Sequence, residues 1–310
     1  MADMVLKRDR RTVARAITSV ENDAPDSTAL LQSLYKHTGH AYRIGLTGPP
    51  GAGKSTITNK LARYYRGRDL KVGIIAVDPT SPFTGGALLG DRVRMTDVEL
   101  DSEVFIRSMA SRGSLGGLSK KAKEAADILD AAGFDIIILE TVGVGQSELD
   151  IAGAADTTIV VLVPESGDGI QAMKAGLMEI ADFFVLNKAD RPGAEQAVMS
   201  IKMILGFRPH NETSWMADVI KTQANEGNGI SEIADCVEKH RKFLEGGGLE
   251  KKRKVRLVNR VREIVEGRLQ NDFWNQGRSQ ALEQRIDQVI TRKVSPYELA
   301  SELIAGFKNL

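Results

Sequence analysis

A short segment near residue 50 combines glycines, a lysine and a serine in a spacing suited to binding phosphate. It reads Gly48-Pro49-Pro50-Gly51-Ala52-Gly53-Lys54-Ser55 and fits the pattern G-x-x-x-x-G-K-[ST]. The glycines let backbone N–H groups close around phosphate oxygens, and a helix starting near Thr56 adds positive potential at its N-terminus. The Lys54 ammonium can reach the β- and γ-phosphates, and the Ser55 hydroxyl can bind Mg²⁺. We therefore expect residues 48–56 to bind a nucleoside triphosphate.

Carboxylates that could complete a magnesium site occur at three further positions. Glu140 and Asp78 each follow an apolar run, and Asp91 lies in the glycine-rich stretch beyond Asp78. Carboxylate oxygens are suitable ligands for Mg²⁺, and the backbone N–H of Gly143 can sense the γ-phosphate. Aspartates after strands are also common as turn or cap residues, which is the alternative interpretation of Asp78 and Asp91.

A second motif, Asn187-Lys188-Ala189-Asp190, follows the apolar run 183–186 and resembles the N-K-x-D motif of GTPases. The Asp190 carboxylate can accept both the N1–H and the N2–H of guanine, a donor pair that adenine lacks. Asn187 fits the O6/N7 edge of a purine, and the Lys188 stem can lie along the ring. The alternative is a polar helix start after a strand. After a further apolar run, Gln223 and Ala224 could offer a backbone N–H to O6.

The elements that must position these residues are short β-branched apolar runs, separated by amphipathic segments. Continuous apolar strands interleaved with helices predict a doubly wound, mostly parallel α/β sheet, here the G domain of a P-loop NTPase at residues 41–245. Ligands bind at the carboxyl ends of the strands in such sheets. The predicted strands cover residues 43–47, 71–77, 103–106, 135–139, 157–163, 183–186 and 219–222.

Helical regions flank this domain on both sides. Residues 1–40 form the expected N-terminal helical extension, because apolar residues recur there at helical spacing. Gly246-Gly247-Gly248 is expected to be a flexible joint to a C-terminal helical region at 246–310. The last helix there has a capping box with proline at its first position, Ser295-Pro296-Tyr297-Glu298.

The amino-acid composition limits which partners the protein is expected to bind and in which compartment it is expected to occur. The single cysteine, Cys236, excludes an intramolecular disulfide and a multi-cysteine metal site, and it suits a reducing compartment such as the cytoplasm. We expect no membrane partner, because no apolar run approaches the ~18 residues of a membrane span. We also expect no nucleic-acid partner. The formal net charge is only +1, and the basic run 251–256 lies in an amphipathic segment without interleaved aromatics.

Three stretches together resemble the MeaB/ArgK family of P-loop GTPases, namely residues 77–95, 140–150 and 167–190. The resemblance covers essentially the whole chain. It implies a GTP- and Mg²⁺-dependent GTPase that hydrolyses GTP to GDP. It also implies a chaperone that gates cofactor loading and protects an adenosylcobalamin-dependent acyl-CoA mutase, such as methylmalonyl-CoA mutase. The resemblance further implies a homodimer closed by C-terminal helices.

Carried over by position, the resemblance places Asp78, Asp91 and Glu140 around Mg²⁺. It makes residues 167–174 a mobile third switch that responds to nucleotide and partner through Asp168, Gln171 and Lys174. A cation such as Lys174 could stabilise charge on the γ-phosphate oxygens, the alternative being a solvated lysine. Glu165-Ser166 stands where the family usually has glycines, so a stiffer loop is expected here.

Two other functions are compatible with parts of the pattern. A nickel-insertion GTPase belongs to the same superfamily, but it needs cysteine and histidine ligands. One cysteine and four scattered histidines argue against it. An ATPase or kinase associated with lysine/arginine/ornithine transport is the older description of the same family, and it fits poorly with Asn187–Asp190 as a guanine motif.

Overall fold

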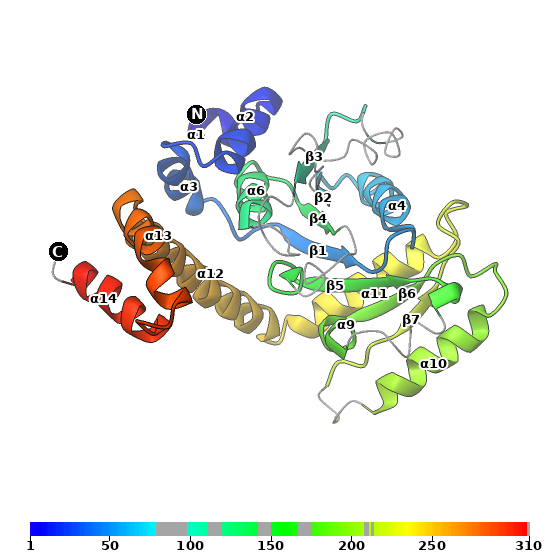
Figure 1. Cartoon of the computed structure of the whole chain (residues 1–310). Coiled ribbons are helices and arrows are strands. Elements are labelled where there is room, and N and C mark those ends of the chain that lie inside the picture. Colours follow the sequence, from blue (N-terminus) through cyan, green and yellow to red (C-terminus); the bar gives the residue numbers. More distant parts are fainter. Residues whose placement is uncertain are drawn as a thin grey trace. The chain divides into compact units, whose positions relative to one another are not determined.

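The computed structural model describes residues 1–78, 98, 100–110, 120–141, 150–166, 175–207, 211 and 214–308 of the chain. Within these residues, seven strands form one sheet in the order β3-β2-β4-β1-β5-β6-β7 (Figure 1). Every pairing between neighbouring strands is parallel, which confirms the doubly wound fold class. The strands are β1 (Tyr42–Thr47), β2 (Val72–Asp78), β3 (Val104–Ala110), β4 (Ile136–Glu140), β5 (Thr157–Leu162), β6 (Phe183–Leu186) and β7 (Val219–Lys221).

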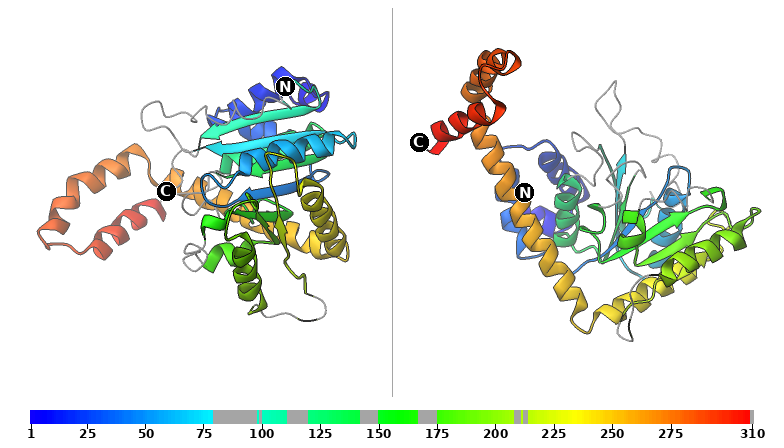
Figure 2. Two further views of the ribbon diagram at one scale, coloured as in Figure 1. Left: turned by 90° about the vertical axis from the view of Figure 1, so that its right-hand side faces the viewer. Right: turned by 60° about the horizontal axis from the view of Figure 1, so that its bottom comes forward.

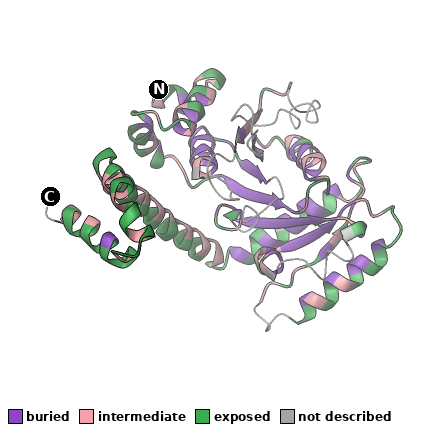
Figure 3. Cartoon of the chain, viewed as in Figure 1, coloured by how far each residue is buried: buried purple, intermediate pink, exposed green. Residues whose placement is uncertain are grey.

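The strands form because their residues are apolar on both faces. Every residue of β1, β4, β5 and β6 is buried, which is the pattern of a parallel sheet covered by helices on both sides (Figure 3). Edge strand β3 carries the polar residues Arg107 and Ser108. Arg107 forms an ion pair with Glu21 of α2 (Arg10–Glu21), with 2.6 Å between guanidinium nitrogen and carboxylate oxygen.

Helices cover the two faces of this sheet (Figure 2). On one face, α4 and α11 bury their apolar residues against β1, β2, β4, β5 and β6. On the other face, the N-terminal helices and α6 pack over β2, β3 and β4, and α9 and α10 pack over β5, β6 and β7. The helices are α1 (Ala2–Leu6), α2 (Arg10–Glu21), α3 (Ser27–Tyr35), α4 (Lys54–Arg66), α6 (Lys120–Ala131), α9 (Ala175–Ile180), α10 (Ala194–Gly206) and α11 (Ile230–Leu244), with the short 3-10 helix η2 at Pro164–Ser166.

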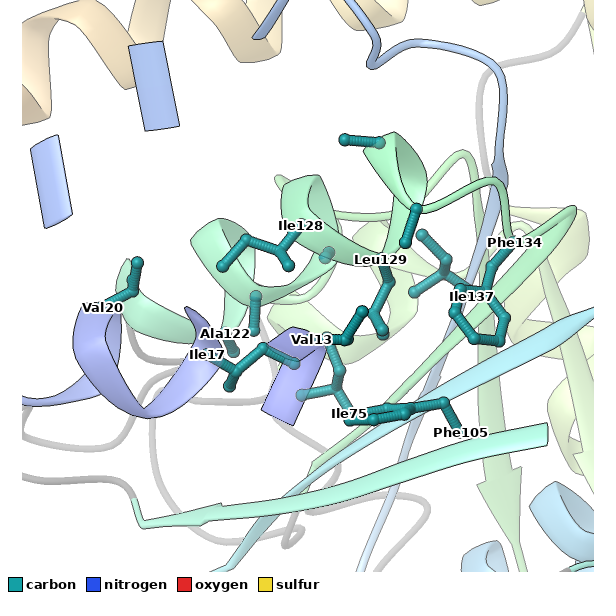
Figure 4. Close-up of a cluster of buried hydrophobic side chains, with 14 of the residues drawn as sticks. Val13, Ile17, Val20, Ile75, Phe105, Ala122, Ile128, Leu129, Phe134 and Ile137 are labelled. Atoms are coloured by element: carbon teal, nitrogen blue, oxygen red, sulfur yellow. The ribbon is translucent and has the colours of Figure 1, made fainter. Parts of the chain in front are cut away.

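The N-terminal helices share a core with the sheet. Val13, Ile17 and Val20 are fully or almost fully buried on α2 and belong to one cluster with Leu129 of α6 and Phe105 of β3 (Figure 4). The apolar stripe that the sequence shows in this region is therefore the face that closes the core over α6.

The chain divides into two compact units, residues 1–249 and 250–310. The second unit contains α13 (Gln276–Ile290), α14 (Pro296–Lys308) and all but the first two residues of α12 (Gly248–Phe273). Phe273 contacts Phe307 edge-on, with 5.5 Å between ring centroids, and Arg278 lies over both rings. The predicted capping box starts α14, since Glu298 N donates to Ser295 Oγ and Ser295 N donates to Glu298 Oε2.

Candidate nucleotide-binding site

The segment between β1 and α4 has the backbone conformation that its glycines allow. Gly48, Gly51 and Gly53 have φ angles of +134°, +75° and +92°, a region that other residues adopt only with strain. A Cβ atom at Gly48 would collide with the carbonyl oxygen of Val161, and one at Gly53 with the side-chain nitrogen of Asn187. The loop is therefore closed tightly against the ends of β5 and β6.

The N-terminus of α4 is open toward this loop. Gly53 is the N-cap of this helix and makes no side-chain capping bond. The N–H groups and the positive dipole end of such a helix N-terminus favour an anion. The Lys54 ammonium is buried and donates to the carbonyl oxygens of Gly48 and Pro49 at 2.8 and 3.0 Å. These bonds hold the cation inside the loop, where a bound phosphate would meet it.

Glu140, at the end of β4, lies beside the start of α4. Its Oε1 accepts a 2.6 Å hydrogen bond from Ser55 Oγ, and its Oε2 accepts a 2.8 Å bond from Thr58 Oγ1. Glu140 is buried, with 3% of its surface exposed. A serine hydroxyl and a carboxylate held together are oxygen donors of the kind that Mg²⁺ prefers, so the residues present fit this ion.

Asp78 is the last residue of β2, on the strand next to β4 and at the same edge of the sheet as Glu140. The backbone of Asp78 is described, whereas its side chain is not. The other predicted metal, phosphate-sensing and switch residues lie outside the described residues: Asp91, Gly143, Asp168, Gln171 and Lys174.

Asn187 connects three parts of the site. Its Nδ2 donates to the carbonyl oxygen of Ala52 at 2.8 Å. Its Oδ1 accepts from Thr222 Oγ1 at 3.2 Å and from Ala224 N at 3.1 Å. The side chain thus joins the phosphate loop to the loop after β7. This bridging role adds to the base contact predicted for Asn187, and it uses the Ala224 N–H that we expected to face O6.

The remainder of the predicted base-binding loop is more open. Asp190 is exposed, and Lys188 has a φ of +57°, which turns the chain sharply between Asn187 and Asp190. The Gln223 backbone N–H donates to Asn228 O at 3.1 Å. Both motif loops therefore have defined conformations, and the Asp190 carboxylate is accessible to a ligand.

An ion pair connects the residue after this motif to η2, which precedes the predicted third switch. Arg191 donates to Glu165 of η2, and this hydrogen bond lowers the pKa of the Glu165 carboxyl. Glu165, which stands where the family usually has a glycine, is therefore bound by Arg191, the residue after the predicted base-binding motif.

Sequence reasoning missed two threonines of this site. Thr58 binds Glu140, and Thr141 donates to Thr47 Oγ1 at 2.9 Å, which pairs the ends of β4 and β1. The only available signal for Thr58 was its position three residues after Ser55, on the same face of the helix.

A phosphate loop between a buried strand and a helix, an acidic residue at the end of β4 and an N-K-x-D loop after β6 define a P-loop GTPase. The chain belongs to the MeaB family, because residues 13–278 match the family described as "Methylmalonyl Co-A mutase-associated GTPase MeaB".

Individual relatives span nearly the full chain. A protein of Pyrococcus abyssi described as a candidate GTPase is 46% identical over 313 residues, which cover 99% of this chain and 97% of the relative. The mouse protein "Methylmalonic aciduria type A homolog, mitochondrial" is 32% identical, over 98% of this chain and 78% of its own. The solved structure of a protein called LAO/AO transport system kinase is 30% identical, with a TM-score of 0.74 over 99% of this chain and 97% of that one.

In the part of the chain that the structure describes, no helix is long and apolar enough to cross a membrane.

Proposed function

We propose that this protein is a GTP-hydrolysing chaperone of an adenosylcobalamin-dependent acyl-CoA mutase of the methylmalonyl-CoA mutase type, gating cofactor loading and protecting the mutase. The observation that carries the proposal is the match of residues 13–278 to a family described by its association with that mutase. The mouse relative, named for methylmalonic aciduria, supports the same partner. A cytoplasmic location is part of the proposal, since the only cysteine, Cys236, is a free thiol.

In this proposal, GTP and Mg²⁺ occupy the site between β1, β4 and α4. The backbone of residues 48–56 and the Lys54 ammonium bind the phosphates, while Ser55 and Glu140 hold Mg²⁺ together with Asp78 and Asp91. Mg²⁺ would neutralise charge on the β- and γ-phosphate oxygens. Lys54 already lies in a buried position, so it needs only to exchange carbonyl acceptors for phosphate oxygens.

Asp190 and Lys188 would bind guanine. The exposed Asp190 carboxylate supplies two acceptor oxygens for the N1–H and N2–H donors. Asn187, held by Ala52 and Ala224, keeps this loop in register with the phosphate loop. Gln223 and Ala224 would lie beside the O6 edge, where the base would have to displace the bonds from their N–H groups to Asn228 O and Asn187 Oδ1. Guanine and phosphate binding would then depend on each other through one buried amide.

Two further regions would take part in the response to the mutase and in assembly. Residues 167–174, with Asp168, Gln171 and Lys174, would act as the third switch. Lys174 would stabilise charge on the γ-phosphate oxygens, and Gly143 would sense that phosphate. The C-terminal region 246–310 closes a homodimer. The dimer proposal is supported by an exposed row of apolar side chains on α12, in which Val261 is 60% exposed and Leu269 is 53% exposed. The row consists of Val255, Val258, Val261, Val265 and Leu269.

Cofactor loading is the direct test of the chaperone function. Apo-mutase is mixed with adenosylcobalamin and this protein, and cobalamin transfer is followed by its visible absorbance with GTP, GDP or a non-hydrolysable GTP analogue. We expect transfer to depend on which nucleotide is present and to lose that dependence with Lys54→Ala. Loading that is identical with all three nucleotides would reject the gating role.

The solved relative is named as a transport-system kinase, which favours one second candidate, an ATP-dependent kinase. This candidate predicts that ATP competes with GTP at similar concentration and that phosphate is transferred to an acceptor other than water. A competition titration with ATP against labelled GTP separates the two candidates. The Asp190 carboxylate can accept from both N1–H and N2–H of guanine, whereas adenine lacks this donor pair, so the GTPase should prefer GTP. Stoichiometric nickel binding would instead favour an insertion GTPase.

A further inference from the structure

Both carboxylate oxygens of Glu140 are bound by hydroxyl groups of the same helix. Ser55 Oγ donates to Oε1 at 2.6 Å and Thr58 Oγ1 donates to Oε2 at 2.8 Å. Ser55 and Thr58 are three residues apart on α4, so they lie on one face of the helix, toward the end of β4. The carboxylate is therefore held at two points, which fixes its rotation as well as its position.

The environment makes the Thr58 contact a strong constraint. Thr58 has no exposed surface, and Glu140 is 3% exposed, so water does not compete for this hydrogen bond. A buried hydrogen bond to a charged group is stronger than a neutral one. Threonine in a helix has two accessible χ1 rotamers, and the hydrogen bond to Glu140 selects the one that directs the Thr58 hydroxyl at the carboxylate.

Packing alone does not require a hydroxyl at this position. Valine has nearly the shape of threonine and costs no desolvation of a polar group in the interior. A threonine at a completely buried helix position is therefore explained by what its hydroxyl binds, which is Glu140.

We infer that Thr58 is a positioning residue for the magnesium site. It fixes Glu140 so that Oε1 stays beside the Ser55 hydroxyl and the two present their oxygens to Mg²⁺ together. This inference rests on the proposed magnesium site. Mg²⁺ demands near-octahedral geometry and tolerates little rotation of its ligands, so a partner behind the ligand changes metal affinity.

The test is the Mg²⁺ dependence of nucleotide release, a readout separate from hydrolysis. Release of N-methylanthraniloyl-GDP from the full-length protein is measured against free Mg²⁺ for the wild type, Thr58→Val, Thr58→Ala and Thr58→Ser. The matched control is Thr158→Val, a change at an equally buried threonine of β5 whose hydroxyl has no hydrogen-bond partner among the described residues. Unfolding temperature without nucleotide identifies any variant that does not fold.

We expect the half-saturating Mg²⁺ concentration to rise about tenfold in Thr58→Val and Thr58→Ala, the lower end of the range for partners of metal ligands. Thr58→Ser and Thr158→Val should keep the wild-type value. The inference is wrong if a folded variant without the hydroxyl retains the wild-type Mg²⁺ dependence. If release from the wild type itself is independent of Mg²⁺, the proposed magnesium site fails, and the role of Thr58 fails with it.

Discussion

At the scale of single residues, we expect guanine selectivity to depend on the carboxylate of Asp190. We expect Asp190→Asn to weaken GTP binding about 100-fold, because an amide replaces one of the two acceptors with a donor and removes a charge-assisted bond worth about 2–3 kcal/mol. The same change should improve binding of xanthine nucleotides, whose 2-oxo group accepts where guanine donates. Competition against labelled GTP measures both. Glu195→Gln, an exposed carboxylate change on α10, is the control. Unchanged guanine affinity in Asp190→Asn would overturn the assignment of the base.

Cys236 gives a prediction on pH. Burial, with a smaller contribution from Asp218, raises the pKa of its thiol from 9.0 to about 11. The folded protein keeps this proton where the unfolded chain has lost it, so the contribution is fully present below pH 9 and disappears as pH rises toward about 11. The free energy of unfolding should therefore fall more steeply over this range in the wild type than in Cys236→Ala, as measured by urea denaturation. Parallel curves for the two proteins would contradict the burial of the thiol.

At the scale of elements, Asn187 joins the loops after β1, β6 and β7. Asn187→Ala removes three hydrogen bonds and leaves the Ala52 carbonyl oxygen and the Ala224 N–H without this buried partner. We expect a loss of about 3 kcal/mol in the free energy of unfolding, together with weaker binding of both GTP and GDP. Denaturant unfolding and nucleotide titration measure the two effects. The control is Asn225→Ala, at an exposed asparagine in the loop after β7, which should behave like the wild type.

The elements themselves could be predicted well from sequence. All seven apolar runs form strands, because burial on both faces leaves a continuous apolar signature. The run predicted at 103–106 continues to Ala110, because an edge strand can include Arg107 when a neighbouring helix supplies Glu21 as its partner. Such a compensating partner is distant in the chain and leaves no local pattern.

The contacts within the site were less accessible to prediction. The phosphate loop is recognisable because its glycines and lysine are adjacent in sequence. The hydrogen bond from Asn187 to Ala52 joins residues 135 positions apart, and that from Thr58 to Glu140 joins residues 82 apart. Only the sheet topology, which places β1, β4 and β6 with their carboxyl ends at one edge, brings these groups together.

At the scale of the whole molecule, the proposed homodimer can be tested at the exposed row of apolar side chains on α12. Val258 and Val261 are 44% and 60% exposed. We expect the double variant Val258→Asp, Val261→Asp to be monomeric, because charges at an apolar interface lose their hydration on association. Light scattering after size exclusion measures the mass. Glu266→Gln, on the same helix, should remain dimeric, and a wild type that is monomeric at all concentrations would reject the dimer.

The proposed chaperone function requires that the nucleotide state at the site of Lys54, Glu140 and Asp190 controls association with a mutase. The most direct measurement is the equilibrium binding of this protein to methylmalonyl-CoA mutase, by isothermal titration with a non-hydrolysable GTP analogue, with GDP and without nucleotide. We predict affinities that differ at least about tenfold, or 1.4 kcal/mol, between the GTP-like and GDP states, and a smaller difference in Asp190→Asn. Absence of binding in every state, or equal affinity in all of them, would contradict the account.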